Sequence, residues 1–446
     1  MKQIKKVAMV SLGCSKNLVD AEEMLGILEK NGFENVDDES EADVILVNTC
    51  AFIDAAKQES IDCILEMAEY KKENPNKAIV VTGCLAQRFK EEILKELPEV
   101  DAVVGTNDFY EIAKILKEIR EREEKQVFCS DIPCQMAEDI PRVITTPSYT
   151  AYLKIAEGCD NHCTYCVIPS IRGAYRSRKK EDIVKEAQRL AGNGVKELIV
   201  IAQDTTRYGM DLYGKQELSS LLNELCEIDG IKWIRLHYCY PELVSDELID
   251  TVAKQEKICN YMDIPIQHCN NEILKKMGRR TSKEEITALI KKLREKIPDI
   301  IIRTSLISGF PQETYEQAEE LRDFVSEMNF DRLGVFTYSK EENTPAARLD
   351  GQIDEEEKLC RKEMIMVEQA AVSEELNMAK IGKTYEVLTE GYDSVIKLYY
   401  GRSYAESADV DGKIFFKSKE KLSEGDFVQV LIEDAMEYDL YGKKIQ

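Results

Sequence analysis

Three cysteines in a polar loop have the types and spacing that suit an iron–sulfur cluster. Cys159, Cys163 and Cys166 form a C-x3-C-x2-C pattern directly after the apolar run 152–156, which is typical of a β-strand. Three thiolates would fill three of the four iron corners of a 4Fe–4S cluster, whereas ferredoxin clusters take four cysteines. The loop therefore predicts a cluster whose fourth iron is open to another ligand.

The same loop has two plainer explanations. His162 could complete a zinc site, although structural zinc ligands usually come as two separated pairs rather than one short run. The three thiols could also be inert core residues. Their concentration in a polar loop argues against core packing, so we favour a cluster over both alternatives.

Three further cysteines each follow an expected strand of an N-terminal α/β region. The strands are the apolar runs 7–12, 44–47 and 78–81. They alternate with helical stretches at 20–30, with Asp20 as the N-cap, and at 54–72, a pattern that indicates parallel βαβ units. The carboxyl ends of parallel strands lie along one sheet edge, so we expect these thiols to converge on a second cluster with three protein ligands. The cysteines are Cys14, Cys50 and Cys84.

The other eight cysteines have no such placement, and we expect them to pack in the core. They are Cys63, Cys129, Cys134, Cys226, Cys239, Cys259, Cys269 and Cys360. The segment that holds Cys129 and Cys134 contains prolines and follows the charged stretch 117–125, which indicates an interdomain linker. Fourteen cysteines in a chain of this size favour metal or redox chemistry over a disulfide framework.

Six apolar runs with helical stretches between them predict a partial (βα)6 barrel in the middle of the chain. The runs are 152–156, 197–202, 233–236, 262–266, 301–307 and 332–336. Such barrels carry their chemistry at the carboxyl ends of the strands, and the C-x3-C-x2-C loop follows the first strand. Polar residues follow later strands as candidate ligands, although such residues are more often loop caps or core polar groups. They are Gln203, Asp204, His237, Gln267, His268 and Ser308.

A helix and a small β region follow the barrel. We expect the helix to end near Gly382 and to bury one apolar face, formed by Met364, Val367, Ala371 and Met378. Short runs separated by glycines then predict a small antiparallel β-barrel. The runs are 385–388, 395–400, 413–416 and 427–432. Barrels of this kind often bind nucleic acid, but acidic residues outnumber basic ones here, so a protein partner fits better.

Composition narrows the class of protein. The 446 residues, of which 43% are hydrophobic, indicate two or three folded domains. No run approaches the roughly 18 apolar residues of a membrane span, and the first apolar run is too short for a signal peptide, so we expect a cytoplasmic protein. A formal net charge of −24 disfavours nucleic acid as a partner and favours a basic one.

Together these motifs resemble the radical S-adenosylmethionine (SAM) methylthiotransferases. The C-x3-C-x2-C loop matches the radical SAM signature, and it stands between a three-cysteine α/β domain and a small β-barrel. That order matches the family's layout of an N-terminal cluster domain, a radical SAM barrel and a C-terminal TRAM domain. The resemblance places these domains at 4–120, 145–380 and 381–446, with a linker at 121–144, and implies an α/β fold class.

Within the family, the residues around the first triad resemble the RimO branch, which modifies a ribosomal protein. The matching segments are Ser11–Asp20 (SLGCSKNLVD), Asn48–Ile53 (NTCAFI) and Gly83–Arg88 (GCLAQR). Two residues depart from the branch. Ala21 stands where serine is common, and Gln312 interrupts an otherwise familiar Gly-Phe-Pro-Gly-Glu-Thr motif.

The resemblance implies the chemistry as well. SAM would bind the open iron of the 4Fe–4S cluster on Cys159, Cys163 and Cys166, with Tyr165 against its adenine, and an electron would cleave it to methionine and a 5′-deoxyadenosyl radical. The radical would take hydrogen from the β-carbon of an aspartate in the small-subunit ribosomal protein numbered twelve. A methylsulfur unit would follow from the auxiliary 4Fe–4S cluster on the N-terminal triad, with its methyl from another SAM.

The implied partners are that basic ribosomal protein and a flavodoxin or ferredoxin electron donor, because reductive SAM cleavage needs a low potential. We expect a monomer with no membrane or tRNA partner. Two alternatives stay open. One is a tRNA methylthiotransferase acting on a modified adenosine, and the other is a non-catalytic iron–sulfur carrier or RNA-binding module, which would gain nothing from an open iron at each cluster.

Overall fold

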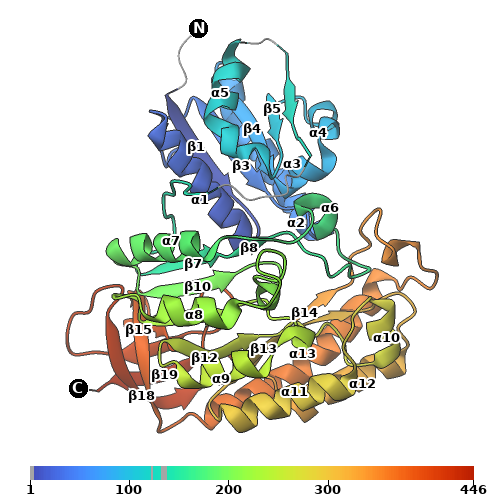
Figure 1. Ribbon diagram of the computed structural model, residues 1–446, viewed down its shortest axis with the longest axis vertical. Coiled ribbons are helices and arrows are strands. Elements are labelled where there is room, and N and C mark those ends of the chain that lie inside the picture. Colours follow the sequence, from blue (N-terminus) through green and yellow to red (C-terminus); the bar gives the residue numbers. More distant parts are fainter. Residues whose placement is uncertain (1–4, 122–123, 132–137, 446) are drawn as a thin grey trace.

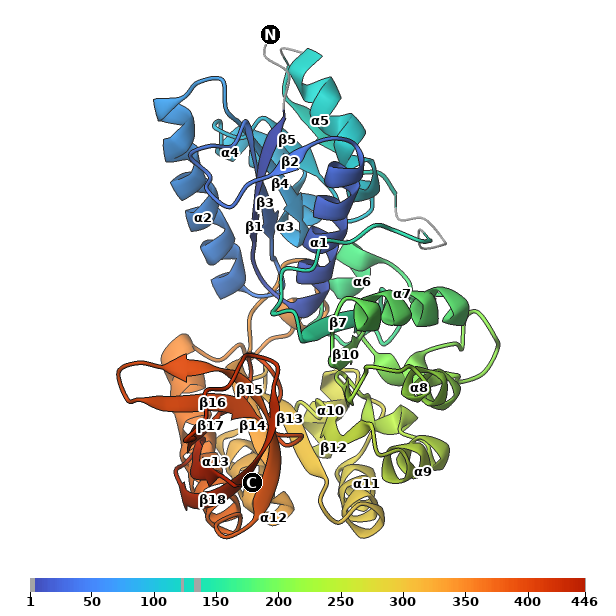
Figure 2. The ribbon, with the colours of Figure 1, turned by 90° about the vertical axis from the view of Figure 1, so that its left-hand side faces the viewer.

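The computed structural model describes residues 5–121, 124–131 and 138–445, which form three structural units. Figure 1 shows an N-terminal α/β unit stacked on a central barrel. Figure 2 shows a C-terminal barrel beside the lower part of the central one. Among the described residues, no helix has the length and apolar character needed to cross a membrane.

The N-terminal unit is a parallel sheet in the order β2-β1-β3-β4-β5-β6. Its strands are β1 (Lys6–Ser11), β2 (Glu34–Asn35), β3 (Val44–Thr49), β4 (Ala78–Gly83), β5 (Ala102–Val104) and β6 (Gln126–Phe128). The strand order reverses between β1 and β3, which creates the topological switch point where such sheets bind ligands. β6 lies inside the segment that the sequence indicated as a linker, so that segment in part completes the sheet.

Helices cover both faces of this sheet. They are α1 (Ser15–Lys30) and α5 (Ile112–Glu121) on one face, and α2 (Asp54–Glu73), α3 (Cys84–Phe89) and α4 (Glu91–Glu96) on the other. Val44 and Leu46 of β3 pack against the first pair, whereas Ile45 and Val47 pack against the other three. Burial on both sides explains why the strands are continuous apolar runs.

The first helix begins earlier than the sequence predicts. Its N-cap is Cys14 rather than Asp20. The Asp20 carboxylate instead forms ion pairs with Lys154 (2.5 Å) and Arg172 (2.5 Å) of the next unit. A tertiary partner therefore takes the side chain that resembled a helix cap.

The central unit is an open six-stranded parallel barrel in the order β7-β10-β11-β12-β13-β14. Its strands are β7 (Thr150–Lys154), β10 (Glu197–Ile201), β11 (Trp233–Leu236), β12 (Ile258–Asp263), β13 (Ile301–Ser308) and β14 (Arg332–Thr337). The covering helices are α7 (Lys180–Gly192), α8 (Leu218–Cys226), α9 (Asp246–Lys254), α11 (Lys283–Lys296), α12 (Tyr315–Met328) and α13 (Glu355–Met378). This confirms the predicted α/β architecture.

Two barrel strands differ from the predicted runs. β12 lies four residues earlier than the run 262–266, and its pairing with β13 ends at Asp263. Pro265 lacks the N–H that a central strand needs, so the apolar residues after Asp263 form a loop. The first run divides into β7 and a short β8 (Ala156–Glu157), which pairs with β9 (Arg176–Ser177).

The C-terminal unit is a closed five-stranded barrel. Its strands are β15 (Thr384–Asp393), β16 (Leu398–Arg402), β17 (Ile414–Lys417), β18 (Phe427–Ala435) and β19 (Leu440–Lys444). All pairs are antiparallel except β17 with β19, which is parallel. The sequence missed β19, and it placed Val395 in a strand although this residue lies in the turn before β16.

The predicted apolar face of α13 is wrong. Val367 is 72% exposed and Met378 is 51% exposed. The buried side carries Ile365 and Val372 together with polar residues. Gln369 donates to the carbonyl oxygen of Phe330 (2.9 Å) and Ser373 to that of Glu437 (2.7 Å). Of the four predicted residues, Met364 packs partly buried against the core, whereas Val367 and Met378 do not.

The remaining cysteines follow the core prediction only in part. Cys226, Cys239, Cys259 and Cys269 are buried. Cys63 and Cys129 are half-buried, whereas Cys360 is exposed on α13, which contradicts the prediction. Cys134 lies outside the described residues.

A loop of the C-terminal barrel fills the open side of the central one. This plug loop (402–412) contacts side chains from all six strands of the open barrel. The pairs are Tyr152 with Asp409 (3.1 Å), Glu197 with Arg402 (2.7 Å), Arg235 with the Tyr404 carbonyl (2.6 Å), Tyr261 with Asp411 (2.7 Å), Arg303 with Asp411 (3.7 Å) and Arg332 with Glu406 (3.0 Å). The two barrels therefore share one polar interior.

Glu197 is the buried carboxylate at this junction. Its oxygens lie 2.7 Å from Nη2 of Arg402 and 3.0 Å from Nε of Arg235. Burial opposes its ionisation, but Arg402 and Arg235 outweigh burial and lower its pKa from 4.5 to about 2. Because the folded pKa lies below the unfolded one, the stabilisation is present above about pH 5 and is lost as the pH falls towards 2.

We expect Glu197→Gln to lower the free energy of unfolding by roughly 3 kcal/mol at pH 7, because it leaves the buried Arg235 without a counter-charge and Arg402 with Glu390 alone. The deficit should shrink as the pH falls from 5 towards 2, because in this range Glu197 takes up a proton in the unfolded wild-type chain while it stays ionised in the folded one. Urea denaturation of both proteins across this range measures it. A deficit that stays constant with pH would contradict the ion-pair explanation.

Candidate functional site

The three N-terminal cysteines lie at neighbouring strand ends. Cys14 follows β1, Cys50 follows β3, and Cys84 directly follows β4. We call them the sheet triad, and they stand at the switch point of the sheet. Gly13 has a φ of +87°, and a Cβ there would lie 2.7 Å from the Cβ of Cys50, so this glycine lets the first two loops touch.

Asn17 fixes the backbone of these loops. Its Nδ2 donates to the carbonyl oxygens of Leu12 (2.8 Å) and Thr49 (3.1 Å), just before two of the cysteines. Its own carbonyl oxygen accepts from Nδ2 of Asn48 (2.7 Å). The amide side chains therefore hold the strand ends at a set spacing.

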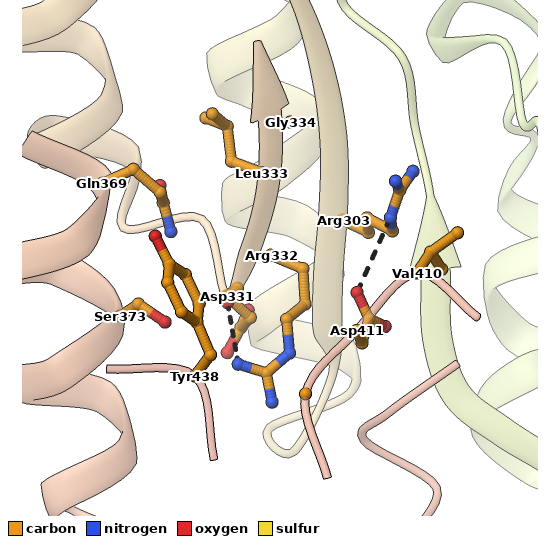
Figure 3. A pocket seen from close by; sticks show the side chains of 11 residues that line it. Arg303, Asp331, Arg332, Leu333, Gly334, Gln369, Ser373, Val410, Asp411 and Tyr438 are labelled. Atoms are coloured by element: carbon orange, nitrogen blue, oxygen red, sulfur yellow. Dashed lines mark hydrogen bonds and ion pairs between the residues drawn. The ribbon is translucent and has the colours of Figure 1, made fainter. Parts of the chain in front are cut away.

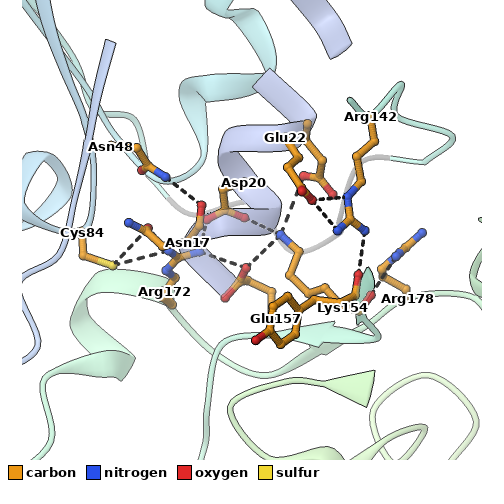
Figure 4. Close-up of polar contacts among 12 residues, drawn as sticks. Asn17, Asp20, Glu22, Asn48, Cys84, Arg142, Lys154, Glu157, Arg172 and Arg178 are labelled. Atoms are coloured by element: carbon orange, nitrogen blue, oxygen red, sulfur yellow. Dashed lines mark hydrogen bonds and ion pairs between the residues drawn. The ribbon is translucent and has the colours of Figure 1, made fainter. Parts of the chain in front are cut away.

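Arg172 brings a positive charge to the sheet triad from the next unit (Figure 4). It ends the short helix α6 (Ile168–Arg172), and its Nη2 lies 3.4 Å from Sγ of Cys84 and 2.9 Å from Oδ1 of Asn17. Burial raises the pKa of the Cys84 thiol to about 12, and Arg172 opposes this rise. Such a thiol ionises at neutral pH only with a metal or cation beside it, which suits a cluster ligand.

The other three cysteines, which we call the loop triad, lie in a loop that folds on itself. The backbone N–H of Cys159 donates to the carbonyl oxygen of Gly173 (3.0 Å), and that of Cys166 to Cys163 (3.1 Å). Sγ of Cys166 accepts from the backbone N–H of Ile168 (3.4 Å). Burial raises the pKa of Cys166, and the thiols of Cys163 and Cys159 raise it further.

The zinc alternative finds no support here. His162 is exposed and has a φ of +50°. Within residues 5–121, 124–131 and 138–445, no three His, Cys, Asp or Glu side chains form a site for a single metal ion. A 4Fe–4S cluster differs from such a site, because each thiolate binds a different iron.

Two side chains from later barrel loops approach Cys163. The hydroxyl of Tyr240 lies 3.6 Å from its sulfur, and Nη1 of Arg279 lies 4.0 Å from it. Arg279 also stacks on the Tyr240 ring, with its guanidinium carbon 4.3 Å from the ring centroid. The buried Nε of Arg279 has no hydrogen-bond partner among the described residues. This side of the loop thus offers a cation with a free donor.

Tyr165 lies in an apolar pocket at the same barrel mouth. It packs against a cluster that includes Met277, Phe310 and Tyr338. Thr164 beside it is held by its backbone N–H, which donates to the carbonyl oxygen of Met277 (2.9 Å). The aromatic ring is therefore fixed next to the loop triad.

Of the polar residues at the strand ends, two lie near the cysteine loop. Nε2 of Gln203 donates to Glu157 (2.5 Å), and its Oε1 is buried without a partner among the described residues. Asp204 accepts from Asn161 (2.9 Å) within the cysteine loop. These two side chains support the loop rather than extend its set of thiolates.

The other polar candidates have structural partners. Nε2 of His237 lies 2.7 Å from the Ser407 hydroxyl of the plug loop, and burial, helped by Arg235, lowers its pKa to about 3. The His268 ring accepts from the backbone N–H of Asn270 (2.9 Å), and the Ser308 hydroxyl donates to the carbonyl oxygen of Lys358 (3.3 Å). Gln267 forms a backbone bridge to Leu306. These contacts agree with the expectation that polar residues at strand ends are more often loop caps or core polar groups than ligands.

Gln312 departs from the familiar motif at a strained position. Its φ is +66°, a left-handed conformation in which glycine carries no Cβ penalty. The next residue, Glu313, accepts from the backbone N–H groups of Gly309 (3.0 Å) and Phe310 (3.2 Å). The Glu313 carboxylate therefore caps the backbone of its own loop. Gln312 affects the backbone strain of this loop rather than the contacts of the loop with the cysteines.

A buried ionic network joins the two triads (Figure 4). Nζ of Lys154 lies 2.5 Å from Asp20, 3.4 Å from Glu157 and 3.7 Å from Glu23. Arg172 pairs with the same Asp20 (2.5 Å) and Glu157 (3.1 Å). Asp20 belongs to the helix capped by the first sheet-triad cysteine, and Glu157 directly precedes the cysteine loop. The network therefore holds the two triads against each other.

A second attachment lies on the opposite side of the barrel mouth. Glu341, in the loop after β14, pairs with Arg88 (2.5 Å) and Lys57 (3.0 Å) of the N-terminal unit. Arg88 lies on α3, the helix that Cys84 begins. With contacts on both sides, the N-terminal sheet covers the end of the barrel where the loop triad lies.

One pocket lies away from both triads (Figure 3). It has a volume of about 300 Å³ and is lined by residues that include Arg303, Arg332, Asp411 and Tyr438. Arg332 begins β14, so the pocket opens at the amino end of that strand, whereas the cysteine loop follows a carboxyl end. It belongs to the junction with the plug loop.

Sequence reasoning missed the charged and aromatic residues around the cysteines. Arg172, Arg279 and Tyr240 stand at no diagnostic spacing, and their neighbours come from distant segments. The one available signal was the position of Arg172, six residues after the last cysteine of the loop.

Sequence comparisons agree with this arrangement. Three family models match the chain. They are "Uncharacterized protein family UPF0004" at residues 6–105, the "Radical SAM superfamily" at 153–325 and the "TRAM domain" at 381–445. A structural neighbour is the radical SAM methyltransferase TsrM from Kitasatospora setae, with a TM-score of 0.57 and 15% identity over 77% of this chain and 74% of that one. At this identity the likeness shows the fold alone.

Full-length relatives are much more similar. A protein of Clostridioides difficile named ribosomal protein uS12 methylthiotransferase RimO is 56% identical over 98% of both chains. Proteins of the same name are 53% identical in Lachnoclostridium phytofermentans, over 98% of this chain and 99% of that one, and 52% in Pelotomaculum thermopropionicum, over 99% of both. Radical SAM enzymes use SAM and a 4Fe–4S cluster, and the all-thiolate donor sets fit such clusters. This chain is therefore an enzyme of the RimO family of radical SAM methylthiotransferases.

Proposed function

We propose that this enzyme replaces a hydrogen on the β-carbon of an aspartate in small-subunit ribosomal protein uS12 with a methylthio group. The observation that carries the proposal is the buried ionic network that joins the unit with the sheet triad to the unit with the loop triad. Relatives more than half identical over nearly the whole chain carry the corresponding name. A single-cluster carrier would need neither the second site nor its rigid attachment.

The six cysteines are the proposed ligands. Cys159, Cys163 and Cys166 would hold the cluster that binds SAM, and the sheet triad would hold the auxiliary cluster. With SAM, these groups supply a one-electron cleavage to methionine and a radical that removes the substrate hydrogen, and a methylsulfur unit that replaces it. An external low-potential donor such as a flavodoxin or ferredoxin provides the electron.

Other residues would position SAM and exclude water. Tyr165, held among Met277 and Phe310, offers an aromatic surface for the adenine. Arg279 places a cation beside Cys163 with one donor free for the carboxylate of SAM. The N-terminal sheet covers the barrel mouth, so a radical formed there is kept from solvent.

The acidic surface supports a basic protein substrate. A formal net charge of −24 attracts a basic ribosomal protein and repels tRNA at long range. We propose that the enzyme acts as a monomer in the cytoplasm, where the ribosomal protein is made. The same charge argues against the tRNA alternative.

Mass spectrometry tests the substrate. The purified enzyme with reconstituted clusters is incubated with SAM, a reductant, and either uS12 or tRNA. We expect a gain of about 46 Da on uS12 alone, because the net change exchanges C–H for C–S–CH3. A uS12 variant with alanine in place of the target aspartate serves as the control. Methylthio addition to tRNA, or none to uS12, would overturn the proposal.

A further inference from the structure

Lys16 is a buried cation without an acidic partner. It lies two residues after Cys14 on α1, its exposed fraction is 8%, and no carboxylate of the described residues lies within ion-pair distance of it. Other buried cations nearby are paired, as Lys154 and Arg172 show. Tyr238 and the Cys14 thiol favour its charged form, whereas no carboxylate pairs with it directly. Lys16 thus has no carboxylate partner among the described residues.

The neighbour of Lys16 belongs to the central barrel. Its Nζ lies 3.2 Å from the centroid of the Tyr238 ring. Tyr238 follows β11 with a φ of +60°, a left-handed conformation that is strained for a bulky side chain. Hydrogen bonds hold it there, since its N–H donates to Asp263 (3.2 Å) and its carbonyl accepts from the N–H of Thr205 (3.0 Å). Strain that is maintained in this way is typical of ligand sites.

The position of Lys16 is between the two triads. Its helix is capped by a sheet-triad cysteine, and the Tyr238 ring comes from the barrel mouth that also carries the loop triad. The first turn of α1 contains no acidic residue, so the positive end of the helix dipole adds to the ammonium. The neighbouring Ser15 hydroxyl is also buried without a hydrogen-bond partner among the described residues. All these features favour an anion.

We propose that Lys16 binds the carboxylate of the substrate aspartate, an inference that rests on the proposed function. The carboxylate carbon of an aspartate is bonded directly to the β-carbon. A cation that holds the carboxylate therefore fixes the C–H bond that must react, one bond away from the anchor. The entering carboxylate also supplies a direct ion-pair partner, which Lys16 does not have among the described residues. Lys16 is thus the residue that selects an acidic side chain at this site.

Among the described residues, Arg279 is another buried cation near the cysteines for which no ion pair with a carboxylate is seen, and it fits the aspartate less well. It contacts Cys163 and Tyr240 of the barrel, on the side assigned to SAM. Lys16 is carried by the sheet-triad helix, from which the methylsulfur unit is to be transferred. Each cation therefore has a separate anion.

Binding measurements with two substrates and three enzymes test the proposal. Cluster-loaded wild-type, Lys16→Met and Lys30→Met enzymes are titrated with uS12 that carries either aspartate or asparagine at the target position. Lys30 is an exposed lysine on the same helix and serves as the matched control. We expect wild type and Lys30→Met to bind the aspartate form about 30-fold or more tightly than the asparagine form. Lys16→Met should bind both forms equally.

Lys16→Arg guards against a fold defect, since it keeps the charge and should keep part of the preference. Equal cluster content in the variants, by absorbance, shows that the sheet triad is intact. Retained discrimination in Lys16→Met, or equal weakening of both substrates, would overturn the role of Lys16. Failure of the wild-type enzyme to modify uS12 would instead overturn the proposed function, so the two failures are distinguishable.

Discussion

The Cys159→Ala enzyme is expected to form no 5′-deoxyadenosine from SAM when reduced, whereas the wild type forms it readily. Cys159 is buried, and its backbone N–H donates to the carbonyl oxygen of Gly173, which fixes the position of this cysteine in the loop. With one thiolate missing, the loop cannot hold the cluster that delivers the electron. Liquid chromatography of the reaction with dithionite and SAM measures the product.

Two matched variants sharpen this result. Cys360→Ala removes an exposed cysteine far from the proposed site in the sequence and should leave 5′-deoxyadenosine formation unchanged. Cys84→Ala should still cleave SAM but should add no methylthio group to uS12, because it disrupts only the sheet triad. Persistent 5′-deoxyadenosine in Cys159→Ala would show that the loop triad is not the radical-generating site.

The Lys154→Met variant is expected to lose about 3–5 kcal/mol of unfolding free energy, the cost of removing one partner from a buried ionic network. The side chain of Lys154 is 1% exposed, and its Nζ lies within 3.7 Å of Asp20, Glu23 and Glu157. The methionine fills a similar volume but leaves these acids without their shared cation. Urea denaturation followed by circular dichroism measures the change.

Lys6→Met provides the comparison for this variant. Lys6 also pairs with an acid, Glu41 at 2.8 Å, but the two side chains are 36% and 58% exposed. Solvent screens such a pair, so we expect a much smaller change than for Lys154→Met. Equal changes in the two variants would mean that the network between the units adds no more than a surface pair.

The strands and the six cysteines could be predicted because buried parallel strands are continuous apolar runs. β3 and β4 are buried throughout, and their ends coincide with Cys50 and Cys84. β2, with two residues, and β5, with three, are too short to stand out in the sequence. A strand could therefore be predicted where a long apolar run is buried on both faces of the sheet.

The charged surroundings of the cysteines could not be predicted, because their partners belong to other units. Asp20 has the sequence features of a helix cap, and only the fold shows that Lys154 and Arg172 take it. The sequence shows only that Lys16 lies near Cys14. That no carboxylate pairs with Lys16 among the described residues depends on the tertiary structure. Ionic contacts between distant segments leave no periodic pattern in the sequence, so they cannot be predicted from it.

Some of the acids counted in the C-terminal barrel do not lie on its surface. Glu406 and Asp411 turn inward and pair with Arg332 and Arg303. Those acids are counter-charges for the central barrel and are unavailable to a partner. The repulsion of nucleic acid by the chain as a whole is unaffected, because it rests on the net charge.

The plug loop limits which C-terminal domains can be exchanged between members of this family. Three separate family models describe the chain as a row of modules. The acids and carbonyls that satisfy Arg235 and Arg332, however, come from the last module while the arginines come from the middle one. A C-terminal domain exchanged between relatives must therefore bring a compatible loop, and we expect the last two modules to be exchanged together.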